Sequence, residues 1–131
     1  MSNYAFHITR KGTFDTIVQD TTAALKEEGF GVLTEIDVAA TLQAKLQIEH
    51  RPYRILGACN PTLAHQALEA DPDIGTLLPC NVVVREESDG TVSVLFMDPE
   101  AVLGLVNKPE VTALGHQVRE RLLRVANALR D

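Results

Sequence analysis

The fold of this chain is decided by residues 80–97, which read CNVVVREESDGTVSVLFM. Stretches rich in apolar and β-branched residues, including the run Val82-Val83-Val84, lie on both sides of Ser88-Asp89-Gly90, a sequence typical of a tight turn. The stretch therefore predicts two strands, residues 80–87 and 91–97, joined as a hairpin. A turn this short joins only antiparallel strands. We therefore expect an α+β fold with a largely antiparallel sheet, and not a parallel α/β fold.

The remaining sequence supplies three more strands and the helices that cover them. Period-two alternation predicts strands at residues 4–9, 30–36 and 53–59. Helical spacing predicts helices at residues 14–28, 38–46 and 61–70, a short helix or lid at 99–106, and a long C-terminal helix from 109 or 110 to 129. We expect two layers, with about five strands in the sheet and the helices packed on one face.

Length, composition and charge exclude several classes of protein. The 131 residues, 45% hydrophobic and 23% charged, suit a single globular domain over residues 1–131. The net charge of −6 leaves no basic footprint, so we expect no nucleic-acid partner. No apolar run approaches the ~20 residues of a membrane span, and no signal-peptide pattern is present. Two cysteines are too few for a disulfide scaffold, so we expect a soluble protein of the cytoplasm.

Strand alternation also divides the sheet into two faces. We assign to the helix-covered core the residues Tyr4, Phe6, Ile8, Phe30, Val32, Ile36, Tyr53, Ile55, Val82, Val84, Val92, Val94 and Phe96. The opposite face then carries His7, Leu33, Glu35, Arg54, Leu56, Ala58, Val83, Arg85, Leu95 and Met97. An open sheet face should be mostly polar, and this one contains several large apolar residues. We therefore expect a homodimer through this face; the alternative is that helix 38–46 or helix 99–106 covers it.

Two cysteine–asparagine motifs bracket the predicted helix 61–70. They are Cys59-Asn60-Pro61 and Pro79-Cys80-Asn81. Asn60 is suited to cap the helix, and proline is favoured at its first position. Alternation predicts that both thiols face the core near strand ends. The apolar segment 71–79 should pack against the body, but its path leaves open whether the two cysteines meet at one edge of the sheet.

Several chemistries are compatible with these motifs. A thiol just before a helix is favoured as thiolate, so Cys59 with His65 would make a nucleophile pair, although helical spacing turns His65 toward water. A metal site would add His7, His50, His65 or His116 to the two thiols, but no CxxC or HxxxH spacing is present. A disulfide is a further alternative. Free cysteines are usually small buried residues, and this interpretation is favoured.

The leading functional hypothesis is a small dimeric binding or accessory domain that is not an enzyme. A small-molecule site would lie near Cys59, Asn60, Cys80, Asn81 and His65, beside the loops 71–79 and 98–108, since polar groups among apolar ones are typical of ligand sites. We expect no catalytic residue, no metal and no cofactor. The alternative is a thiol-based enzyme or a redox or metal-binding protein that uses Cys59 and Cys80.

The two motifs also carry a family resemblance. Residues 57–61 (GACNP), followed by Leu63-Ala64, Ala67-Leu68, Ile74-Gly75 and residues 77–82 (LLPCNV), resemble the bacterial and archaeal family called domain of unknown function 302. The resemblance extends over nearly the whole chain. It implies one copy of the unit that occurs twice in the TATA-binding protein, β-α-β(4)-α in outline, and it implies homodimers. It implies no activity, substrate or catalytic residue.

Overall fold

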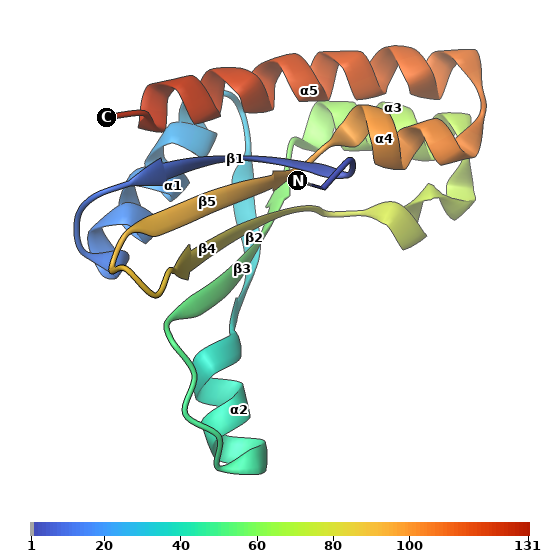
Figure 1. Cartoon of the computed structure of the whole chain (residues 1–131). Coiled ribbons are helices and arrows are strands. Elements are labelled where there is room, and N and C mark those ends of the chain that lie inside the picture. The colour runs from blue at the N-terminus through green and yellow to red at the C-terminus, as the bar shows by residue number, and fades with distance from the viewer. Residues whose placement is uncertain (1) are drawn as a thin grey trace.

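The computed structural model describes residues 2–131 and contains a five-stranded sheet with helices (Figure 1). The strands are β1 (Ala5–Arg10), β2 (Gly31–Asp37), β3 (Tyr53–Cys59), β4 (Cys80–Glu86) and β5 (Val92–Met97). The α-helices are α1 (Phe14–Glu27), α2 (Val38–Leu46), α3 (Pro61–Ala70), α4 (Pro99–Leu103) and α5 (Pro109–Leu129). Two 3-10 helices, η1 (Pro72–Leu77) and η2 (Gly104–Val106), follow α3 and α4.

The sheet has the order β1-β5-β4-β3-β2, and every neighbouring pair is antiparallel. This confirms the α+β fold and the hairpin between β4 and β5. In the hairpin turn, the backbone N–H of Thr91 donates to Asp89 Oδ1 at 2.9 Å. Gly90 has φ of +87°, which a residue without a side chain adopts at little cost. The turn residues therefore explain why the chain reverses at this point.

Helices α1, α3 and α5 form the second layer on one face of the sheet (Figure 1). The long helix α5 packs against both α1 and α3 and touches β1. Its buried stripe is Val111, Leu114, Gly115, Val118, Leu122, Val125, Ala126 and Leu129, which meets the fully buried Val82, Val84, Val94 and Phe96 of the sheet in one core. Within residues 2–131, no helix combines the length and apolarity needed to cross a membrane.

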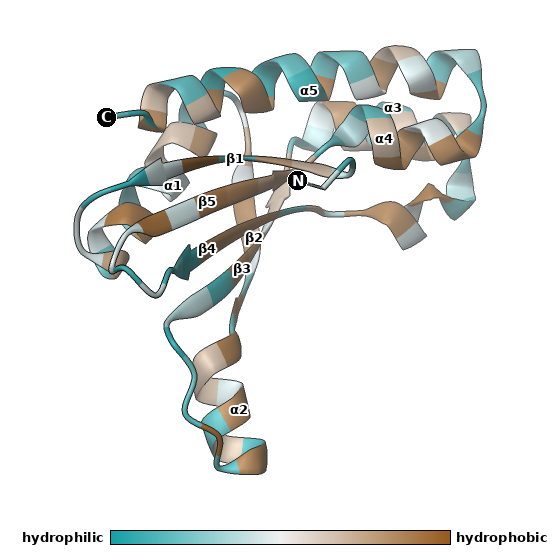
Figure 2. Ribbon diagram, viewed as in Figure 1, coloured by the Kyte–Doolittle hydropathy of each residue, from teal (hydrophilic) through white to brown (hydrophobic). Residues whose placement is uncertain are grey.

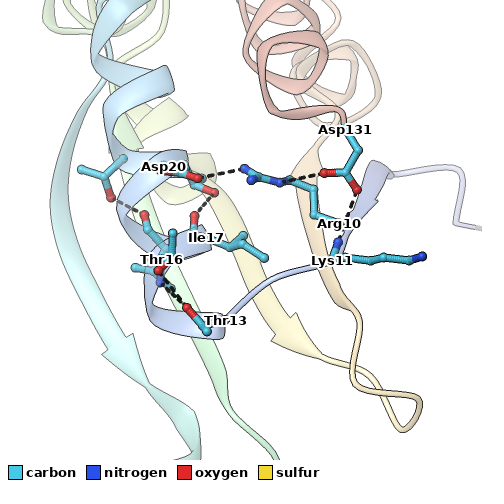
Figure 3. A network of polar contacts seen from close by, with 10 residues as sticks. Arg10, Lys11, Thr13, Thr16, Ile17, Asp20 and Asp131 are labelled. Atoms are coloured by element: carbon cyan, nitrogen blue, oxygen red, sulfur yellow. Dashed lines mark hydrogen bonds and ion pairs between the residues drawn. The ribbon is translucent and has the colours of Figure 1, made fainter.

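A polar network joins the end of β1 to the first turns of α1 and to the residues after α5 (Figure 3). The Arg10 guanidinium donates to Asp20 Oδ2 at 3.0 Å and lies 3.4 Å from Asp131 Oδ1. The backbone N–H of Lys11 donates to Asp131 Oδ2 at 3.3 Å. Thr13 caps α1, because its hydroxyl oxygen accepts a hydrogen bond from the backbone N–H of Thr16. These contacts hold the β1–α1 connection and the end of α5 together.

The predicted faces of β3 are wrong. Leu56 and Ala58 are buried in the core, whereas Tyr53 and Ile55 lie on the open face. The register places Leu56 opposite the fully buried Val82, so the two side chains share a face. Strand β3 is flanked on both sides, and its residues 55–59 are apolar or small on both faces. Alternation therefore could not distinguish its core side from its open side.

A β-bulge in β2 overturns a second assignment. The pairing of β2 with β3 shifts between Val32 and Thr34, and the extra residue, Leu33, is 69% exposed. One added residue exchanges the two faces for the rest of the strand. Ile36, predicted in the core, therefore pairs with Ile55 on the open face. For the same reason Glu35 lies on the helix side of the sheet and not on the predicted open side.

The face of the sheet opposite α1, α3 and α5 is not covered by either short helix. Helix α4 packs against α5, and the main contacts of α2 are with β3. In Figure 1, α2 projects away from the sheet on the side opposite α5. The alternative in which residues 38–46 or 99–106 fold over this face is therefore not what the chain adopts.

Candidate functional site: an apolar cavity at Cys59 and Cys80

The antiparallel pairing of β3 and β4 brings the two cysteine motifs to the same end of the sheet. Ala58 of β3 lies opposite Cys80 of β4, so Cys59 is one residue beyond this pair. Residues 60–79 leave the sheet after Cys59, form α3 and η1, and return at Cys80. The sequence left open whether the two cysteines lie close together. The register shows that they do, because they are neighbours on adjacent strands.

An apolar cavity of about 380 Å³ lies beside the two cysteines. This volume is in the range of about 300–1,000 Å³ typical of small-molecule sites. The wall comes from the ends of β2, β3 and β4, from α3, η1 and α5, and from the end of α4. It is lined by Phe30, Leu33, Thr34, Ala58, Cys59, Asn60, Leu63, Ala64, Ala67, Leu68, Gly75, Leu78, Pro79, Cys80, Leu103, Leu114 and Val118. None of these residues is charged.

Asn60 fixes the start of α3 at the edge of this cavity. Its Oδ1 accepts a hydrogen bond of 3.1 Å from the backbone N–H of Leu63, and Pro61 follows as the first helical residue. Its amide nitrogen sits against Gly29, where a Cβ would lie only 2.8 Å away. Gly29 has φ of +86° and follows the end of α1. Asn60 is therefore a helix cap that also contacts the α1–β2 turn.

The two thiols differ in exposure and in acidity. Cys80 is only 6% exposed, and burial, followed by the charge of the nearby Cys59, raises the pKa of Cys80 to about 11. It is therefore a neutral thiol at pH 7. Cys59 is half-buried in the cavity wall. The prediction that both thiols face the core is confirmed for Cys80, whereas Cys59 is only half-buried, at the wall of the cavity.

Two of the candidate residues lie away from the cavity. Asn81 follows Cys80 along β4, so it points to the opposite face of the sheet and is exposed there. His65 is on the outer side of α3 with its Nε2 3.4 Å from Glu69 Oε1, in the exposed position that helical spacing predicts. The structure therefore brings together Cys59, Asn60 and Cys80, and separates Asn81 and His65 from them.

No metal centre accompanies the cysteine pair in the part of the chain that the structure describes. No group of three or more His, Cys, Asp and Glu side chains comes close enough to hold an ion among residues 2–131. His50 stacks edge-on against Tyr53 with ring centroids 5.9 Å apart. His116 Nδ1 lies 2.6 Å from Glu100 Oε1 at the surface. Neither imidazole joins the two thiols.

Many wall residues belong to the paired motifs, but the sequence did not predict a cavity among them. Leu114 and Val118 belong to the predicted apolar stripe of α5, and Leu63 and Ala67 to that of α3, but a stripe predicts packing and not empty space. Ala64 and Ala67 of α3 and Gly75 of η1 are the small residues on this side of the wall. Small residues in a helix do not by themselves predict a cavity, so the sequence offers no short signal for this space.

Comparisons with known proteins concern the fold and the family of this chain. The chain matches no curated protein. A crystal structure of an uncharacterized conserved protein DUF302 from Bacillus stearothermophilus aligns with a TM-score of 0.91 and 28% sequence identity, covering 98% of this chain and 100% of that chain. The sequence profile of the family described as "Domain of unknown function DUF302" matches residues 6–129. The match spans nearly all of the sequence and includes both cysteine motifs, so the chain belongs to the DUF302 family.

Proposed function

We propose that this protein is a non-catalytic binding domain for a small, uncharged, apolar molecule. The observation that carries the proposal is the cavity of about 380 Å³ beside Cys59 and Cys80. Its wall is almost entirely apolar, and its few polar groups come from Thr34, Asn60 and the two cysteines. A ligand without charge loses little hydration when it enters such a cavity, whereas a charged group would enter without a partner.

Binding is favoured over thiol catalysis by the residues around the cavity. A nucleophile pair needs a general base within hydrogen-bond reach of the thiol, and no His, Asp or Glu lines the cavity. Cys80 is buried with a raised pKa, which disfavours the reactive thiolate. The side-chain oxygen of Asn60 is already engaged in capping α3. The thiols are therefore better explained as small wall residues of a binding site than as a nucleophile pair.

The test uses two fluorescent probes that share an aromatic scaffold. Neutral phenylnaphthylamine should bind at least about tenfold more tightly than anilinonaphthalene sulfonate, a difference of about 1.4 kcal/mol. Ala64→Leu, which adds bulk inside the cavity, should weaken binding of the neutral probe. Ala128→Leu on the exposed side of α5 is the matched control and should not. Equal binding by both variants, or a preference for the anion, contradicts the proposal.

We also infer that the protein is a homodimer through the open face of the sheet. Apolar side chains on this face include Tyr53, Ile55, Val83, Leu95 and Met97. They line or adjoin a broad hollow of about 1080 Å³ over β1, β5, β4 and β3. The hollow also contains polar residues, but large apolar side chains on an otherwise open sheet face often mark a partner surface. Sedimentation equilibrium tests the inference: a monomer at micromolar concentration contradicts it.

A cytoplasmic location is part of the same proposal. Cys59 and Cys80 are both free thiols although they are neighbours in the sheet. Thiols persist in the reducing cytosol, whereas secreted domains of this size commonly use their cysteines in disulfides. Fractionation of cells that express the tagged protein checks this assignment.

A further inference from the structure

The helix α2 and the residues that lead from it to β3 form a projecting arm, residues 38–52, which we call the α2 arm. No residue of α2 is buried, and its main contacts with the rest of the chain are with β3. Leu46 is 59% exposed and Ile48 is 47% exposed. Figure 1 shows the arm standing clear of the sheet, and Figure 2 shows hydrophobic segments along it. The arm thus presents apolar residues that nothing in its own chain covers.

The arm has a helix cap at its base, but few contacts with the rest of the chain stabilise its remaining residues. Asp37 Oδ1 accepts a hydrogen bond of 2.9 Å from the backbone N–H of Ala40, which caps the helix. Val38, Leu42 and Leu46 recur at a spacing of four residues and form one stripe. An isolated helix shorter than about 12–15 residues is only marginally stable in water, and α2 has nine. The stripe therefore calls for a packing partner.

The open sheet face has dimensions that suit this arm. Nine helical residues extend about 13 Å at 1.5 Å per residue. The hollow crosses β1, β5, β4 and β3, and four strands at their usual separation span roughly 14 Å. Val83, Leu95 and Met97 lie in the hollow and provide an apolar floor. One helix laid across the strands would therefore cover it from side to side.

The charges of the two surfaces are also complementary. The α2 arm carries Lys45 and Arg51 and a single carboxylate, Glu49. The hollow includes Glu87 and Asp89 near the β4–β5 turn. The hydroxyl of Ser93 donates to Glu87 Oε2 at 2.8 Å, and this bond, with a smaller contribution from Arg85, lowers the pKa of Glu87. Arg85 also lines the hollow, and its Nε lies 3.3 Å from Glu87 Oε1, so Glu87 already has a basic partner within its own chain. Asp89 at the exposed turn is therefore the carboxylate that a basic side chain of an arm would approach.

We propose that two copies of this chain exchange arms, so that the α2 arm of each copy packs across the open sheet face of the other. The inference rests on the proposed homodimer and specifies what occupies the face. One exchange covers two surfaces that a single chain leaves bare, the stripe of Leu42 and Leu46 and the floor around Val83. Because each copy both gives and receives an arm, the contact closes on itself as a two-fold dimer.

The first test is cross-linking between two co-expressed variants that carry different affinity tags, both in a Cys59→Ala/Cys80→Ala background. One carries Leu46→Cys and the other Val83→Cys. Arm exchange predicts a disulfide between the two differently tagged chains after mild oxidation with oxidised glutathione. Direct packing of one sheet face on the other predicts instead a disulfide between two Val83→Cys chains. That second result overturns arm exchange and leaves the homodimer standing.

The second test separates the arm from the rest of the surface. Leu46→Glu should weaken dimerisation at least about tenfold in sedimentation equilibrium, since a carboxylate would enter the apolar floor. Leu105→Glu is the matched control, because Leu105 is 76% exposed on η2, away from the arm. This variant should dimerise like the unmodified chain. Equal dimerisation by the two variants overturns arm exchange alone. A monomeric unmodified chain overturns both the homodimer and the exchange. Circular dichroism confirms that both variants remain folded.

Discussion

The hydroxyl group of Thr34 on β2 lies over the backbone of Gly57 on β3, at the place that a side chain on residue 57 would occupy. The ring of Pro79 closes the same space, with its Cγ 2.9 Å from that position. The two strands and the segment that returns from η1 thus meet over a residue without a side chain. Glycine is required there by close approach of neighbouring groups, because the backbone of Gly57 does not have a positive φ.

This contact predicts that Gly57→Ala destabilises the protein. The added methyl group has to displace Thr34 and Pro79, and such overpacking costs about 1–3 kcal/mol. Urea unfolding measures the loss. Gly75→Ala is the matched control, because nothing lies within 4 Å of the place that its added methyl group would take, and it should be nearly neutral. Adding Thr34→Ala to Gly57→Ala should restore part of the stability, and a double variant no better than Gly57→Ala alone contradicts the assignment.

The raised pKa of Cys80 predicts a loss of stability at alkaline pH. The thiol ionises at its ordinary pKa of 9.0 in the unfolded chain and at about 11 in the folded protein. Between these values the folded state holds the additional proton, so the free energy of unfolding falls as pH rises. The contribution is fully present below pH 9, and a shift of this size is worth about 2–3 kcal/mol.

Chemical denaturation from pH 8 to pH 11 measures this effect as a difference between the unmodified chain and Cys80→Ala. The alanine variant lacks the titrating group, so its stability should decline less steeply over the same window. Other groups titrate in both proteins and cancel in the comparison. Parallel curves would show that the Cys80 thiol is not protected from ionisation by burial.

The different exposure of the two cysteines predicts selective alkylation. Cys59 is half-buried in the cavity wall, whereas Cys80 is buried, so a maleimide should label Cys59 first in the folded protein. Mass spectrometry should find that Cys59→Ala removes the rapid labelling and that Cys80→Ala leaves it. Bound phenylnaphthylamine should slow the rapid reaction, because it occupies the space beside the thiol. Unchanged labelling in its presence would place the probe elsewhere on the protein.

The two asparagines of the paired motifs should respond differently to substitution. Asn60→Ala removes the cap of α3 and should cost about 1 kcal/mol, which thermal unfolding detects. Asn60→Asp retains the capping oxygen and should recover most of this loss. Asn81→Ala changes an exposed residue on the open face and should leave the monomer fold almost unaffected. A larger effect of Asn81→Ala on unfolding would reverse the structural roles of the two residues.

The fold was predictable from the sequence wherever local chemistry dictates one conformation. Asp89 and Gly90 specify the turn, Thr13 and Asn60 cap their helices, and the stripe of α5 has a single period. These signals depend on residues that are close together in the chain, so they can be recognised without knowledge of the tertiary contacts. They were sufficient for the element order and the antiparallel sheet.

The faces of β2 and β3 were not predictable for a different reason. The bulge at Leu33 has no marker residue such as glycine or proline, and it exchanges inside and outside for the rest of β2. On β3, Ile55 and Leu56 are similar in size and polarity, and only the pairing of Leu56 with Val82 decides which is buried. Both errors arise because the deciding contacts are between strands that are distant in the sequence.

The candidate site was predictable in its position but not in its shape. The motifs around Cys59 and Cys80 pointed to the correct end of the sheet. His65 and Asn81 do not line the cavity, because His65 is on the outer side of α3 and Asn81 is on the open face of β4. The elements packed around α3 and β4 decide which of their faces meets the cavity. The empty volume is a sum over several elements, and no short pattern encodes it.

Residues 60–79 enter and leave the sheet at adjoining positions, since Ala58 lies opposite Cys80. The two ends of this segment lie close together on adjacent strands, and the register of the strands does not depend on what lies between these ends. The same geometry lets the chain alter the length or composition of residues 61–78, and with them the size of the cavity, without altering the sheet that supports it.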